Sequence, residues 1–213
     1  MAINATTDYV KRDLIPAGNY QARCWFMVEI GTVQEQFPGK GSKSLKKVRI
    51  GWELPTELID IDGVKKPVAL DKEYTLSMYK GSHLRIDLAS WRGKDFSDEE
   101  AKLFDVTKLL GKTCLVNIIH KASKQDATKI YELISGITPG PKGMTILPAV
   151  NPILECSYDK WNEELFESLP EFIRNKIASS EEYKLMKANP PGTSQAQAVS
   201  NDINGVEIED LPF

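Results

Sequence analysis

Two segments with alternating apolar residues place aromatic and positively charged side chains together on one outward face. Apolar side chains occupy every second position from 19 to about 36 and again from about 46 to 54, which predicts two strands that each bury one face. The opposite face carries Arg23, Trp25, Met27, Lys47 and Arg49, and a third segment adds Tyr79. Aromatic rings stack on the bases of an unpaired polynucleotide, and cations pair with its phosphates. This set therefore favours binding of a single-stranded nucleic acid.

Two lysine-bearing loops border the same surface. The segment 37–47 is rich in glycine and lysine without apolar periodicity, which predicts an irregular loop. A second loop, at 122–127, separates two later alternating segments. The additional candidate contacts are Lys40, Lys43 and Lys46 in the first loop, Lys121 and Lys124 at the second, and Tyr131 as a further stacking residue. The alternative is that Trp25 packs beneath another segment and that the lysines are only solvated.

Residues suited to catalysis or metal binding do not gather in the sequence. The cysteines lie far apart with no Cys-x-x-Cys pair, and His83 and His120 are the only histidines. Asp60 and Asp62 belong to an Asp-x-Asp-Gly segment, which is more typical of a turn than of a metal site. Neither a phosphate-binding glycine loop nor a hydrolase or zinc-protease motif is found. We therefore expect no enzymatic activity, no metal and no cofactor.

The remaining elements predict the fold that positions these side chains. Further strands are expected at 73–80, 113–121 and 128–137. Residues 84–91 show helical spacing between Ser82 as N-cap and Gly93 as stop, and a capping box at 97–100 opens another short helix. The order of three strands, a helix and two strands is that of the OB-fold, a five-stranded Greek-key barrel that binds oligonucleotides. We expect a mainly β protein with an OB-fold-like barrel.

Four parts are expected along the 213 residues. They are an N-terminal arm at 1–18, the barrel at 19–150, a helical appendage at 151–188, and a flexible linker with an acidic tip at 189–213. Helices are expected at 158–169, 171–178 and 180–187, where they could pack on the barrel, mediate self-association or serve a partner. The polar composition at 189–205 is typical of a linker.

Composition and charge narrow the classes of protein. With 41% hydrophobic and 27% charged residues, the chain is an ordinary globular protein. No apolar run reaches the roughly 18 residues of a membrane span, and no signal-peptide pattern is present, so we expect a cytoplasmic protein. Residues 1–150 carry a net charge of +4 and residues 151–213 a net charge of -7. This split favours a polyanion-binding body and a tail with a different task.

The C-terminal residues have the properties of a docking peptide. They combine acidic side chains with an apolar end and consist of Glu207, Glu209, Asp210, Leu211, Pro212 and Phe213. The apolar end suits a pocket on a partner, and the acidic residues suit a basic rim around it. An acidic tail that only aids solubility is the alternative.

This ending resembles the tail of bacterial-type single-stranded DNA-binding proteins. The segments 50–55, 90–93 and 168–173 are similar to bacteriophage single-stranded DNA-binding proteins. The chain departs from the bacterial pattern in its few acidic residues, its short linker and its added helices. The resemblance implies an OB-fold body that coats DNA in replication, recombination or repair, and a tip that recruits a polymerase, helicase, nuclease or recombinase.

Two other functions remain open from the sequence, besides the weakest alternative of a metal-dependent nuclease that uses scattered carboxylates. One is a phage recombination protein that anneals complementary strands. The other is an adaptor whose barrel binds no DNA and whose tail contacts the replication machinery.

Overall fold

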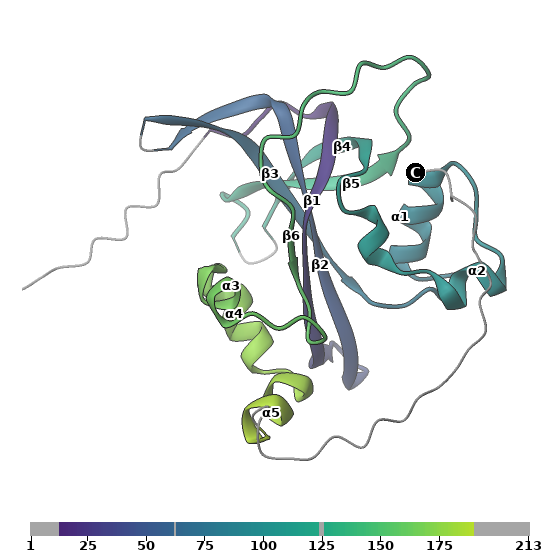
Figure 1. Cartoon of the computed structure of the whole chain (residues 1–213), viewed down its shortest axis with the longest axis vertical. Helices are drawn as coiled ribbons and strands as arrows, with labels where there is room; N and C mark the ends of the chain where they lie inside the picture. The colour runs from purple at the N-terminus through teal and green to yellow at the C-terminus, as the bar shows by residue number, and fades with distance from the viewer. Residues whose placement is uncertain (1–12, 62, 124–125, 190–213) are drawn as a thin grey trace, which may run out of the picture.

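The computed structural model describes residues 13–61, 63–123 and 126–189 and is mainly β (Figure 1). Its strands are β1 (Gly18–Phe37), β2 (Gly41–Ile61), β3 (Val64–Thr75), β4 (Thr113–Ala122), β5 (Ile130–Thr138) and β6 (Leu154–Cys156). Its helices are α1 (His83–Arg92), α2 (Asp98–Leu103), the 3-10 helix η1 (Val106–Leu109), α3 (Glu163–Ser168), α4 (Glu171–Ala178) and α5 (Glu181–Ala188). Among the described helices, none is both long and apolar enough to cross a membrane.

Strands β1 to β5 form a curled antiparallel sheet in the order β3-β2-β1-β4-β5, and β6 pairs with β1 in parallel. β1 is long enough to serve both halves of the sheet, because Gly18–Arg23 pairs with β4 and Arg23–Phe37 pairs with β2. The sheet curls until β3 contacts β5, and α1 and α2 lie between β3 and β4 in the chain. This is an OB-like half-barrel, as the order of elements predicts.

Several predicted boundaries need correction. The segment 37–47 is not an irregular loop, because β2 already begins at Gly41, opposite Phe37, and a tight turn joins the two strands. The expected strand at 73–80 ends at Thr75, where the chain turns away from the sheet toward α1. Glycine and lysine carry no alternating apolar signal, so an exposed hairpin is invisible to hydrophobic periodicity.

The helix signals located α1 and α2 correctly. Ser82 accepts a hydrogen bond from the Arg85 N–H at the start of α1, and Gly93 ends the helix with a left-handed φ of 73°. Ser97 and Glu100 form the expected reciprocal capping box of α2. Downstream, α4 and α5 match their expected ranges, whereas only Glu163–Ser168 of the expected helix at 158–169 is helical.

The apolar core lies on both sides of β1. One cluster fills the half-barrel beneath α1, where the rings of Trp52 and Trp91 lie 6.2 Å apart. The other cluster joins β1 to β6 and to the C-terminal helices, with Ile173 and Ile177 of α4 buried against Ile30. A fully buried large apolar side chain contributes about 1.5–3 kcal/mol, so α4 is firmly held on the sheet. The residues from 154 to 188 therefore cover the outer side of β1.

Candidate nucleic-acid interface

A bulge in β1 changes which side chains reach the surface. The register with β2 shifts between Cys24 and Phe26. Because a one-residue shift reverses the face of every following side chain, Cys24 and Met27 both enter the half-barrel core, whereas Phe26 packs under the C-terminal helices. Both faces of β1 are covered here. The expected outward position of Met27 is wrong, since it is only 3% exposed.

Arg23 is also buried, contrary to its expected outward position. Its Nε donates to Oε1 of Glu53 at 2.6 Å, and Glu53 is completely buried. Arg23 also donates to the carbonyl of Asn151, and the Asn151 N–H donates to Oε2 of Glu53 at 2.8 Å. Removing one member of such a pair would leave a buried charge without compensation. Arg23 therefore fastens the segment around Asn151 to the sheet.

Trp25 packs beneath the C-terminal part of the chain. This is the alternative that the sequence left open to its stacking on a base. Its ring is tilted against Phe26 with the centroids 5.6 Å apart. Together with Leu169 and Pro170 it lines an apolar pocket of about 230 Å³ beside α4. Within the described residues, its buried indole N–H has no hydrogen-bond partner. Trp25 is thus no open stacking platform.

Carboxylates neutralise the cations of β2 that were expected to meet phosphates. The closest pairs are Arg49 with Asp71 at 2.5 Å, Lys46 with Glu29 at 2.7 Å and Lys47 with Glu35 at 3.7 Å. The Arg49 guanidinium also lies over the ring of Phe172, 4.9 Å from its centroid. A phosphate that approached these cations would compete with the carboxylates already there.

The other candidate contact residues are exposed wherever the structure describes them. Lys40 and Lys43 lie at the end of the β1–β2 hairpin. Lys121 on β4 and Tyr131 on β5 pair directly across the sheet, and Tyr131 is 43% exposed. Tyr79 is 77% exposed in the loop between β3 and α1. The candidates outside the described residues are Lys124 and the tip residues Glu207, Glu209, Asp210, Leu211, Pro212 and Phe213.

A groove of about 710 Å³ lies where the curled sheet brings β3 and β5 together. Its lining combines cations, one carboxylate, hydroxyl groups and apolar side chains, and includes Lys47, Lys72, Glu73, Tyr74, Ser77, Ser82, His83, Leu133 and Ser135. Lys72 Nζ and the Tyr74 hydroxyl both bond Oδ2 of Asp87 on α1, at 2.6 and 2.7 Å. These contacts fix one wall of the groove. Tyr131 lies on the same face of β5 as Leu133, two residues away.

The loop at 76–82 lines both this groove, through Ser77 and Ser82, and a second hollow, through Met78 and Tyr79. The second hollow, of about 450 Å³, is lined by Tyr79, Lys80 and Lys102 among others. Within the loop the Ser82 N–H donates to the Tyr79 carbonyl at 2.8 Å, and the Ser82 hydroxyl donates to the Ser77 carbonyl at 2.5 Å. Tyr79 is therefore an exposed ring on a hydrogen-bonded loop that lines both hollows.

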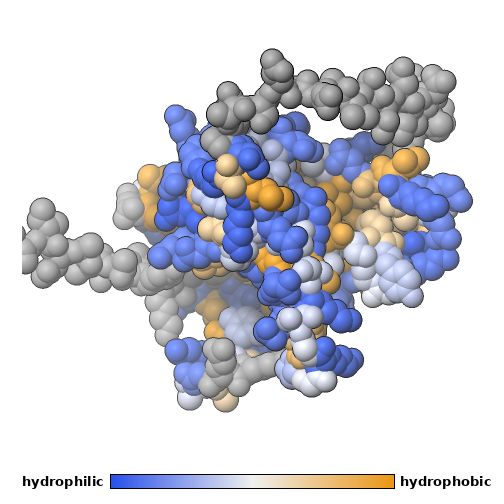
Figure 2. All heavy atoms as spheres, turned by 90° about the horizontal axis from the view of Figure 1, so that it is seen from below, coloured by the Kyte–Doolittle hydropathy of each residue, from blue (hydrophilic) through white to orange (hydrophobic). Residues whose placement is uncertain are grey.

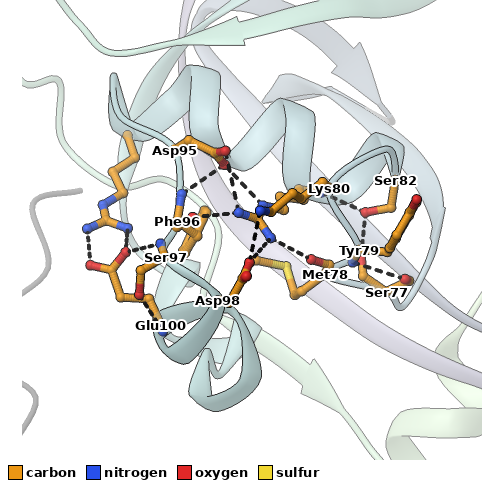
Figure 3. Close-up of polar contacts among 12 residues, drawn as sticks. Ser77, Met78, Tyr79, Lys80, Ser82, Asp95, Phe96, Ser97, Asp98 and Glu100 are labelled. Carbon is orange, nitrogen blue, oxygen red and sulfur yellow. Dashed lines mark hydrogen bonds and ion pairs between the residues drawn. The ribbon is translucent and has the colours of Figure 1, made fainter.

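Arg85 of α1 holds this loop from beneath, and its side chain is only 4% exposed. Its Nη1 donates to the Met78 carbonyl at 3.2 Å, its Nη2 donates to the Phe96 carbonyl at 2.5 Å, and its Nε donates to Asp95 at 3.0 Å (Figure 3). The hydrogen bond from Arg85 lowers the pKa of Asp95, and so does a hydrogen bond from the backbone N–H of Phe96. Arg85 carries no signal in the sequence, because arginines are mostly exposed and no local pattern marks this one as buried.

The arrangement brings together an exposed aromatic ring and several lysines around the loop at 76–82. Residues 13–61, 63–123 and 126–189 contain no group of three or more His, Cys, Asp or Glu side chains placed to hold a metal ion. No protein-family model, curated protein or solved structure was found to match this chain. The function therefore rests on the residues of this interface.

Proposed function

We propose that this protein binds single-stranded DNA without sequence preference, for replication, recombination or repair in the cytoplasm of a bacterial or phage-infected cell. The observation that carries the proposal is the exposed ring of Tyr79 on a loop that Arg85 fixes, beside the groove of an OB-like half-barrel. Every base has a face that stacks on an aromatic ring, so such contacts tolerate any sequence. The protein holds the strand and does no chemistry on it.

The strand follows the groove and crosses the loop that carries Tyr79. Lys102 pairs with a phosphate on one side of this loop, and Lys80 does so in exchange for Asp98, whose Oδ1 lies 3.4 Å from its Nζ and is exposed. On the other side the strand runs past β5, where Tyr131 stacks a second base and Lys121 meets the backbone. This path replaces the β1–β2 face that the sequence favoured. Tyr79, Tyr131 and Lys121 remain from the contacts expected from the sequence, and Lys80 and Lys102 are added to them.

Binding across a salt series tests the proposal. A labelled single strand of mixed sequence should bind more tightly than its duplex, with the logarithm of affinity falling by about 0.7 per phosphate contact for each unit of log salt. Saturation without faster pairing of complementary strands would favour coating of DNA over annealing. An absence of binding at about 20 mM salt would overturn the proposal and favour an adaptor.

Recruitment of partners by residues 207–213 is part of the same proposal and rests on the resemblance of the tip. The full chain should capture a host polymerase, helicase, nuclease or recombinase, whereas a chain shortened by these residues should not. DNA binding by the shortened chain serves as the control. Equal capture by both chains would exclude the tip as the docking segment.

A further inference from the structure

The C-terminal helices contact β1 where a second bulge interrupts its pairing. The register with β2 shifts between Glu29 and Gly31, and Gly31 has a φ of +89°. The polar groups that this bulge leaves unpaired within the sheet are buried or partly buried, and they are satisfied from the C-terminal side. The Thr32 N–H donates to Oε2 of Glu182 at 2.6 Å, and its hydroxyl donates to Oε1 at 2.8 Å. The Tyr158 hydroxyl donates to the Ile30 carbonyl at 3.0 Å.

A further set of contacts joins α4 and α5 to the strands that follow this bulge. Lys176 Nζ lies 2.9 Å from Oε1 of Glu35 and 2.6 Å from Oε1 of Glu73, so α4 is tied to β1 and β3 together. The hydrogen bond from Lys176 lowers the pKa of Glu35 below its ordinary value. From α5, Glu181 accepts a hydrogen bond from the Ser44 hydroxyl of β2 at 3.3 Å.

These contacts hold the hairpin that carries Lys40 and Lys43 from its base at Thr32 as far as Glu35 and Ser44, and Glu35 lies directly opposite Lys43. Beyond the bulge, β1 and β2 pair with each other as far as Phe37 and Gly41. A two-stranded ribbon is only marginally stable by itself, so its direction depends on what holds its base. Figure 1 shows α5 beside this end of the β1–β2 hairpin.

Viewed from below, the molecule presents a mostly hydrophilic surface with small apolar patches (Figure 2).

We propose that Glu182 and Lys176 are positioning residues for nucleic-acid binding. By fixing the base of the hairpin, they hold Lys40 and Lys43 where these cations extend the edge of the groove that Lys47 lines. The helical appendage thus sets the reach of the basic hairpin, without touching the strand itself. This inference rests on the proposed function.

A double-mutant cycle tests the positioning role. The change E182Q should weaken binding of a labelled single strand by about three- to tenfold in the wild-type chain, and by less than about 1.5-fold when Lys40 and Lys43 are both glutamine. The change E163Q is the matched control, because Glu163 pairs with Lys187 within the helical unit and should leave affinity unchanged. An equal loss in both backgrounds, or no loss in the wild-type chain, would overturn the inference.

Amide exchange at residues 33–44 gives a second readout that needs no DNA. E182Q should speed exchange in the hairpin while the core amides of β4 keep their protection. If the wild-type chain bound no DNA, the proposed function would fail, whereas faster hairpin exchange would still support the structural half of the inference. If E182Q did not fold, Lys176→Met should give the same pattern from the other contact. Unchanged exchange and affinity in Lys176→Met would also overturn the inference.

Discussion

Replacing Arg85 by methionine tests whether the Tyr79 loop is held as described. The change keeps most of the side-chain volume but removes the donors to the carbonyls of Met78 and Phe96. A buried carbonyl without a donor costs about 1–3 kcal/mol, so the two together lower the free energy of unfolding by about 2–6 kcal/mol. Asp95 is mostly exposed and returns to water, so it adds little.

For a chain of this size, that loss corresponds to a fall in Tm of about 4–24 °C, which calorimetry or circular dichroism measures directly. Arg174→Met is the matched control, because Arg174 is one-third exposed and its partner Glu167 is exposed. Its Tm should change by less than about 4 °C. The reasoning is refuted if Arg85→Met melts within about 2 °C of the wild type, or no lower than Arg174→Met.

Other changes probe the stacking residue, an acid-sensitive pair and the second bulge. Tyr79→Ala should weaken single-strand binding by about 5- to 140-fold in an anisotropy titration, whereas Tyr79→Phe, which keeps the ring, should bind like the wild type. Hydrogen bonds from Arg92 lower the pKa of Glu100 from 4.5 to about 2, so its contribution is complete above about pH 4.5 and is lost as the pH falls toward 2. Urea unfolding at about pH 7 and pH 3 should show a smaller decline in stability for Glu100→Gln than for the wild type. Gly31→Ala should cost about 1–3 kcal/mol in the same assay, because its new Cβ would lie 2.7 Å from an α5 carboxylate at positive φ. Gly39→Ala has a similar φ and no described neighbour within 4 Å, so a larger loss at Gly31 measures the contact with α5.

Local signals in the sequence predicted the order of the barrel elements, but not all of their bounds. Alternating apolar residues and capping signals such as Ser82 and Gly93 located α1 and gave the OB-like order of strands and helix. They did not reveal β6, and they placed the third strand at 73–80 although β3 spans Val64–Thr75. The exposure of Tyr79 was also expected, although it was assigned to a strand and lies in a loop.

Only the tertiary structure decided which side chains are free to bind a ligand. The bulge after Cys24 reverses the alternation of β1, and the C-terminal helices then cover its outer side, so Trp25 became a packing residue. Pairing with Glu53 turned Arg23 into a structural residue, and carboxylates from neighbouring strands neutralised Arg49. Strand periodicity assigns a side chain to a face, but the segment that covers this face or supplies a counter-charge is distant in sequence. That information exists only in the folded chain.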